Sequence, residues 1–173
     1  MEKTVDPAHE IGENVTITER SEFLFITPEQ GKKIKSLRIE NQVIDDDSYY
    51  YITNLAANPE QLYFANCSFS DNGKWILCEF PSVKKVGFIQ CNLSYDTLKE
   101  LLNSNNPHND MDVLDLTGND LGKDPERFVG ILKDTFFRVK KIKELILVDN
   151  GFDASVVSKI KEALGWFIGK IYL

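Results

Sequence analysis

One spacing of apolar residues recurs along this chain and constrains its fold more than any other feature. Its clearest copy places apolar residues at Met111, Leu114, Leu116 and Leu121, with Asn119 before the last of them. Leu114 and Leu116 are two apart, so both face the same side of a short strand. Asn119 follows where the chain must turn, and its side-chain amide can bond backbone groups there. The stretch therefore predicts a strand and a turn fixed by asparagine.

Four other stretches match the same spacing, and a truncated copy closes the chain. The matching sets are Ile34, Leu37, Ile39, Gln42 and Ile44; Pro59, Leu62, Phe64, Cys67 and Phe69; Val83, Val86, Phe88, Cys91 and Leu93; Ile142, Leu145, Leu147, Asn150 and Phe152; and Ile168, Ile171 and Leu173. The second apolar position of each copy falls at residues 37, 62, 86, 114, 145 and 171. A step of 20–50 residues indicates a repeat architecture rather than chance similarity.

The segments between the expected strands carry helix signals. Ser94, Asp124 and Asp153 each stand where an N-cap is expected, and Pro125 suits a first helical turn. Gly165 suits the C′ position after the last helix. The apolar stripes predicted on these three helices are Leu98, Leu101 and Leu102; Phe128, Val129, Leu132 and Phe136; and Val156, Val157, Ile160 and Leu164.

The first two connecting segments give weaker signals. The acidic run 45–47 predicts the start of a helix, where negative charge complements the macrodipole, and Ile52 and Leu55 are expected to face inward. In the shorter second segment we expect Trp75, Ile76 and Cys78 to pack inward. Alternating strands and helices predict parallel strands joined by right-handed crossovers, and such units bury their apolar faces only by stacking.

The repeated template resembles the leucine-rich repeat of the longer, helix-bearing type, as in ribonuclease inhibitor and the C-terminal regions of NOD-like receptors. The resemblance covers about residues 34–173. It implies an α/β solenoid with a curved parallel sheet on the concave face and helices on the convex face. Residues 1–33 are expected to form an N-terminal cap or boundary segment, with a short strand around Val15 and Ile17. Aromatic residues in several leucine positions, and Gln42 in place of Asn or Cys, depart from the usual template.

Charge and hydropathy restrict the class of partner and compartment. The 173 residues carry a formal net charge of −7, which argues against a general nucleic-acid or anionic-membrane binder. No apolar run reaches the roughly 18–20 residues that a membrane span needs, and the charged N-terminus lacks a signal-peptide core. Three cysteines without metal-ligand spacing indicate reduced thiols. We therefore expect a cytoplasmic protein.

The sequence offers little support for catalysis or for a bound cofactor or metal. Cys67 and Cys91 occupy equivalent turn positions, so we interpret them as buried members of a polar ladder. Neither His9 nor His108 has an evident nucleophile and orienting acid. No glycine-rich phosphate loop is present. A non-enzymatic protein is therefore expected, with Cys78 kept as the candidate nucleophile of an enzymatic alternative.

The candidate binding residues lie on the expected concave face, where they alternate with the buried residues of each strand. Exposed apolar patches and aromatic residues are common at interfaces, and the apolar members of this set gather toward the C-terminal half. The candidate residues are Arg38, Tyr63, Ile89, Val113, Asp115, Ile146, Val148 and Tyr172.

Two functional hypotheses follow besides the enzymatic one. In the first, the module binds a protein partner on its concave sheet, with no nucleic acid or membrane involved, and the resemblance implies a sensing or autoinhibitory part of a larger receptor. In the second, it self-associates through the last strand, Ile168–Leu173. That strand either leaves an open sheet edge or ends the fold with Trp166 and Phe167 closing the core.

Overall fold

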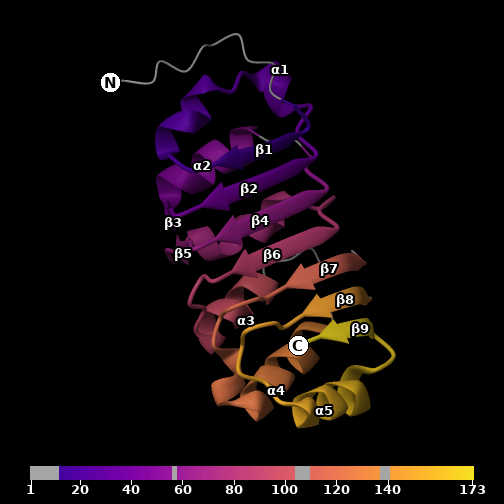
Figure 1. Cartoon of the computed structure of the whole chain (residues 1–173). Coiled ribbons are helices and arrows are strands. Elements are labelled where there is room, and N and C mark those ends of the chain that lie inside the picture. Colours follow the sequence, from indigo (N-terminus) through magenta and orange to yellow (C-terminus); the bar gives the residue numbers. More distant parts are fainter. Residues whose placement is uncertain (1–11, 56–57, 104–109, 137–140) are drawn as a thin grey trace.

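The computed structural model, which describes residues 12–55, 58–103, 110–136 and 141–173, is a mixed α/β structure built on a seven-stranded parallel sheet (Figure 1). Each strand pairs with the next strand of this sheet along the chain, and every pair is parallel. The strands, in spatial order, are β1 (Asn14–Ile17), β2 (Ser36–Glu40), β4 (Gln61–Ala65), β6 (Lys85–Ile89), β7 (Met111–Asp115), β8 (Ile142–Ile146) and β9 (Ile168–Tyr172).

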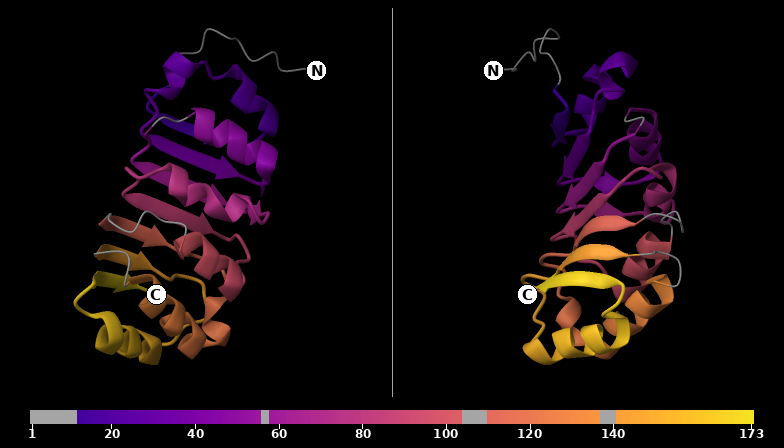
Figure 2. Two further views of the ribbon diagram at one scale, coloured as in Figure 1. Left: turned by 180° about the vertical axis from the view of Figure 1, so that it is seen from behind. Right: turned by 90° about the vertical axis from the view of Figure 1, so that its right-hand side faces the viewer.

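Helices connect these strands and lie along one side of the sheet (Figure 2). The α-helices are α1 (Pro28–Gly31), α2 (Asp46–Leu55), α3 (Tyr95–Asn103), α4 (Pro125–Phe136) and α5 (Ala154–Leu164), and the 3₁₀ helices are η1 (Arg20–Phe25), η2 (Gly73–Glu79) and η3 (Leu121–Lys123). A small second sheet pairs β3 (Val43–Ile44) with β5 (Ser68–Phe69) just after the turns. None of the described helices is both long and apolar enough to cross a bilayer.

The register of the main sheet confirms the alignment of the repeated stretches. The second apolar position of each copy lies beside its equivalent on the neighbouring strand, through the series Leu37, Leu62, Val86, Leu114, Leu145 and Ile171. The first five of these side chains are buried, and Ile171 on the last strand is partly buried. A one-residue slip would turn every buried side chain to the other face, so burial on one face fixes this register.

The predicted caps and inward stripes of the three longer helices are observed. Ser94 Oγ accepts a hydrogen bond from Thr97 N, and Asp124 Oδ1 accepts one from Arg127 N. Asp153 accepts from two backbone N–H groups at the start of α5. The predicted stripe residues that are buried are Leu98, Leu101, Leu102, Phe128, Val129, Leu132, Val156, Ile160 and Leu164, while Val157 is partly buried and the side chain of Phe136 lies outside the described ones.

Trp75, Ile76 and Cys78, in the second connecting segment, were expected to pack inward. This prediction is wrong for Trp75 and Cys78. Trp75 is 54% exposed and Cys78 is exposed, whereas Ile76 is buried together with Leu77. The segment folds as the 3₁₀ helix η2, which has three residues per turn rather than 3.6. The tighter helix buries Gly73, Ile76 and Leu77 and turns Trp75 outward.

Two expectations near the C-terminus also need correction. Gly165 ends α5 with a right-handed φ of −60°, so it is not the left-handed C′ glycine that we expected. Trp166 is 78% exposed and does not close the core. Phe167 is partly buried and packs against the core. Of the two outcomes expected for the last strand, the structure shows the open edge, because β9 pairs with β8 alone among the described strands.

The N-terminal segment joins the sheet. Its expected strand is β1, which pairs in parallel with β2 and buries Ile17. The 3₁₀ helix η1 follows and contributes the buried Phe23. Arg20 in η1 forms an ion pair of 2.6 Å with Asp45, the residue before α2, which links this segment to the first repeated unit.

Left-handed backbone residues recur at the carboxyl end of the strands. They are Asn41, Asn66, Gln90, Gly118 and Asp149. Each lies four residues after the second apolar position of its copy of the repeated spacing. Asn, Asp and Gly tolerate positive φ better than other residues do. The turns after the strands therefore keep one backbone geometry from one repeated stretch to the next. The left-handed conformation of these residues was not expected from the sequence.

Candidate interaction surfaces

The candidate binding residues lie on the face of the sheet opposite the helices, and the register brings most of them into rows. The central row runs across the sheet through Arg38, Tyr63, Gly87, Asp115, Ile146 and Tyr172. Ile89, Val113 and Val148 lie in the two flanking rows. No described helix or strand covers this face (Figure 2). The sheet therefore presents a broad surface that is largely free of the chain's own elements.

Tyr63 is the best-defined group on this surface. Its ring lies over Gly87 on the next strand, because a Cβ added at Gly87 would stand 2.2 Å from Tyr63 Cδ1. Burial raises the pKa of the Tyr63 hydroxyl above its usual value, the charge of Asp115 raises it further, and Arg38 opposes the shift. Glycine at position 87 thus provides the space that the Tyr63 ring occupies, within the influence of a cation and an anion.

Local contacts orient the charged members of the central row. Arg38 Nε donates to the carboxylate of Glu40 on the same strand. Asp115 Oδ1 accepts from Thr117 N at 3.0 Å and from the Thr117 hydroxyl at 2.6 Å. Fixed charges of both signs favour recognition of a complementary polar surface rather than a uniformly apolar one.

The apolar candidates do not form one continuous patch. Val113 lies between Lys85 and Glu144 on the neighbouring strands, so charged residues border it on both sides. Ile146 and Tyr172 are paired neighbours, and Val148 follows Ile146 two residues later. The apolar part of the surface is thus a small group at the C-terminal side of the sheet, where Tyr172 is 41% exposed.

The predicted polar ladder is present and serves the interior. Asn119 Oδ1 accepts from Cys91 N and Leu93 N, and its amide nitrogen donates to the carbonyls of Phe88 and Leu116. Asn150 makes the equivalent bonds one unit later.

The cysteine thiols of the ladder, like the asparagine amide nitrogens, donate to backbone carbonyls of the preceding repeated stretch. The thiols of Cys67 and Cys91 point to the carbonyls of Ile39 and Phe64, both at 3.5 Å. Gln42, in the first unit, buries side-chain atoms that have no hydrogen-bond partner among the described residues. The ladder therefore begins at Cys67, and each later member joins its unit to the one before.

The thiols show no sign of nucleophilic activation. Burial raises the pKa of Cys91 to about 12 and also raises the pKa of Cys67. Partial burial and then the charge of Glu79 raise the pKa of Cys78. A reactive cysteine needs the opposite shift. Among the described residues no three His, Cys, Asp or Glu side chains gather as a metal site, and His9 and His108 lie outside the described residues.

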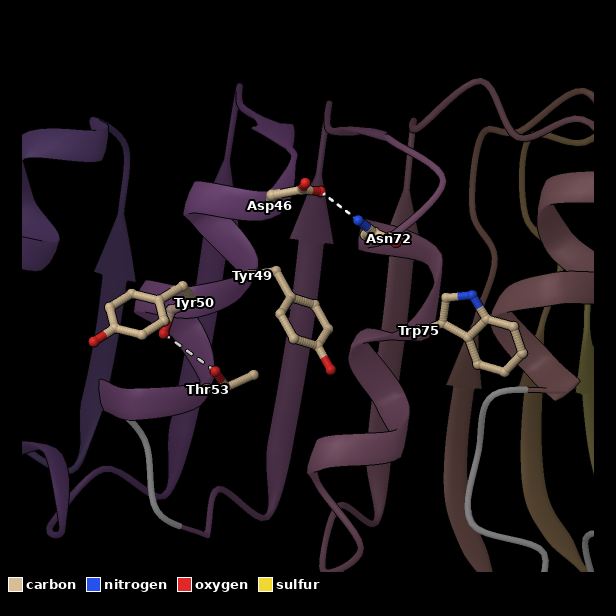
Figure 3. Close-up of a pocket in the computed structure, with 6 residues that line it drawn as sticks. All are labelled: Asp46, Tyr49, Tyr50, Thr53, Asn72 and Trp75. Atoms are coloured by element: carbon tan, nitrogen blue, oxygen red, sulfur yellow. Dashed lines mark hydrogen bonds between the residues drawn. The ribbon is translucent and has the colours of Figure 1, made fainter.

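A second surface lies on the helix side, between α2 and η2. It is a groove of about 510 Å³ (Figure 3), lined by Asp46, Tyr49, Tyr50, Thr53, Asn72 and Trp75. The Tyr49 hydroxyl donates to Glu79 Oε1 at 2.5 Å, and burial together with Glu79 raises the Tyr49 pKa to about 12. Sequence reasoning missed this groove because it placed Trp75 in the core. Three consecutive tyrosines at 49–51 were the available signal, since one helix cannot turn all three inward.

Comparisons with known proteins add no relative. A scan against family models, a search of curated proteins and a search of solved structures each found no match to this chain. The two surfaces therefore rest on the geometry and chemistry of their own residues.

Proposed function

We propose that this chain is a leucine-rich-repeat solenoid that binds a protein partner on its uncovered sheet face and has no catalytic activity of its own. The observation that carries the proposal is the ordered central row from Arg38 to Tyr172 on a sheet face that no described helix or strand covers. Equal register at every step, the stacked parallel units and the asparagine–cysteine ladder support the repeat assignment.

The composition of this face supports a protein as the partner. Aromatic and arginine side chains contribute most often to binding energy at protein interfaces, and Tyr63, Tyr172 and Arg38 supply them here. Cations and anions both occur on this face, as Arg38 and Asp115 in the central row and Lys85, Glu144 and Lys170 in a flanking row. No large single-sign field of the kind that nucleic acids require is therefore formed. Reduced cysteines fit a cytoplasmic location, and the resemblance to NOD-like receptors suggests a sensing or autoinhibitory part of a larger receptor.

A quantitative pulldown from cells that express the protein tests this proposal. The bait carrying Tyr63→Ala and Ile146→Asp should lose a defined set of proteins that the unchanged bait retains. A matched double variant on the helix side, Lys99→Ala with Glu162→Ala, changes two exposed residues of α3 and α5 and should keep the set. Equal melting temperatures would show that all baits are folded. Identical partner sets for the unchanged and sheet-face baits would contradict the proposal.

Self-association through β9 is the second candidate function. The observation that favours it is the open edge of this strand, next to the exposed Trp166 and Leu173. Unpaired backbone groups at a sheet edge can pair with a second chain. Light scattering should then show a mass that rises with concentration and returns to the monomer value on Trp166→Lys. A constant monomer mass over the whole concentration range would exclude this function.

A further inference from the structure

We propose that the groove between α2 and η2 is a second docking site, which takes a basic segment of a partner protein by placing a Lys or Arg side chain against Trp75 and Asp46. The two helices that frame the groove, α2 and η2, lie on the helix side of the sheet (Figure 2), whereas Tyr63 belongs to the row on the opposite face. The proposal is therefore independent of binding on the sheet face, and either can fail without the other.

The aromatic groups of the groove are arranged as an open receptor. Tyr49 projects between Tyr50 on one side and Trp75 on the other (Figure 3). Tyr50 is 64% exposed and Trp75 is 54% exposed, whereas Tyr49 is partly buried and fixed by its bond to Glu79. Large aromatic side chains left in solvent beside a groove are unusual on a surface that has no partner. Their exposed ring faces are available to a ligand.

The charges at the groove favour a cation. Asp46 is the one charged side chain among the described residues that line it, and its recorded partner is the neutral amide of Asn72 at 2.8 Å. Glu79 adds a second carboxylate at the Tyr49 hydroxyl. The nearby cations are already compensated, because Arg20 pairs with Asp45 and Asp47, and Lys74 pairs with Asp71 and Glu100.

Each alternative occupant fits this chemistry less well. An apolar segment would cover the Asp46 carboxylate without neutralising it, and burial of an unpaired charge is costly. An acidic segment would meet like charge. A guanidinium or ammonium group instead gains the carboxylate and the negative faces of the indole and phenol rings, which attract cations within about 6 Å. The whole chain, with its net charge of −7, would also attract a basic segment over longer range.

Fluorescence of the full chain provides a direct test. The sequence contains two tryptophans, so Trp166→Phe leaves Trp75 as the one tryptophan reporter. In that background, titration with a hexa-arginine peptide should shift Trp75 emission in a saturable way. A hexa-glutamate peptide and a neutral peptide of alternating leucine and serine should leave the emission unchanged.

Matched variants separate the groove from general charge attraction. Anisotropy of a labelled hexa-arginine peptide should show about fivefold weaker binding to Trp75→Ala and to Asp46→Asn, the range that cation–aromatic and exposed ionic contacts give. The control Asp134→Asn removes the same charge from an exposed position on α4 and should change binding less than twofold.

The outcomes that overturn the proposal are equally specific. Equal weakening by Asp46→Asn and Asp134→Asn would reduce the effect to net charge. Unchanged affinity of Trp75→Ala would remove the aromatic contact. A shift of Trp75 emission by the leucine–serine peptide that is as large as the shift with hexa-arginine would assign the groove to an apolar segment instead.

Discussion

At the scale of single residues, the ladder amides have the clearest energetic role. Asn119 satisfies two backbone N–H groups and two carbonyls that belong to its own and the preceding unit, and it is 2% exposed. An apolar replacement would leave these buried groups without partners, and such groups lose their full hydration energy. The ladder is thus a structural device, although its members are polar.

Substitution of one ladder amide measures this role. Asn119→Ala should lower the free energy of unfolding by about 3–5 kcal/mol, because several buried backbone groups lose their partners together. Cys91→Ala should cost about 1–2 kcal/mol, since the thiol makes weak bonds and little volume is lost. Urea unfolding monitored by circular dichroism compares the two. A smaller loss for Asn119→Ala than for Cys91→Ala would contradict the ladder interpretation.

A second residue-scale prediction concerns acid. The Arg20 hydrogen bond, together with the Ser48 backbone N–H, lowers the pKa of Asp45 to about 2. A lowered carboxyl pKa stabilises the folded state above the unfolded pKa of about 4, and this contribution is lost as pH falls from 4 through the folded pKa of about 2. The stability difference between the unchanged chain and Asp45→Asn should therefore be largest at neutral pH and smallest at pH 2. Urea titrations at pH 2, 3, 4 and 7 would show it, and a constant difference would refute it.

At the scale of elements, most strands and helices were predictable because their local signals agree with their burial. Period-two pairs such as Leu114 and Leu116 fixed the register, and Asp153 fixed the start of α5. The element η2 was misjudged because no periodicity distinguishes a 3₁₀ turn from an α-helical turn over seven residues. The helix-side groove was missed for the same reason, since it depends on Trp75 pointing outward.

Substitution within η2 tests the corrected orientation. Leu77→Ala should lower the free energy of unfolding by about 2–4 kcal/mol, because Leu77 is 1% exposed in the core. Trp75→Ala should change it by less than about 0.5 kcal/mol, as surface substitutions usually do. Thermal melts of both variants provide the measurement. The reverse order of the two effects would restore the original inward assignment of Trp75.

At the scale of the whole molecule, the sheet is a linear array in which each strand pairs with its sequence neighbours. The helix layer follows the same order, with α3 between η2 and α4, and α5 next to α4. In the stacked-repeat arrangement that we propose, stability would be transmitted mainly between adjacent units. The array order and the sheet face opposite the helices were predictable from the repeated spacing, whereas the exposed aromatic groove needed the packed structure.

Hydrogen exchange can test whether a destabilised strand affects only the strands next to it. Ile17→Ala removes a buried side chain from the terminal strand β1, so amides in β1 and η1 should exchange faster while those in β7 and β8 keep their protection. Leu114→Ala in the interior strand β7 should instead accelerate exchange in β6 and β8 as well. Uniform acceleration across all strands in the Ile17→Ala variant would show a single cooperative unit.

The ladder also bears on the chemical ageing of this protein. Asn150 precedes Gly151, and an Asn–Gly bond is prone to deamidation because glycine leaves its backbone nitrogen unhindered for attack on the side-chain amide. Here that amide is 1% exposed and bonded through both its oxygen and its nitrogen. Conversion to aspartate would replace an obligatory donor with a carboxylate beside the carbonyls of Leu116 and Leu147. The folded chain thus shields this bond, whereas the asparagine of its other Asn–Gly pair, Asn72–Gly73, is exposed. Slow deamidation at Asn150 would record how often the C-terminal units open.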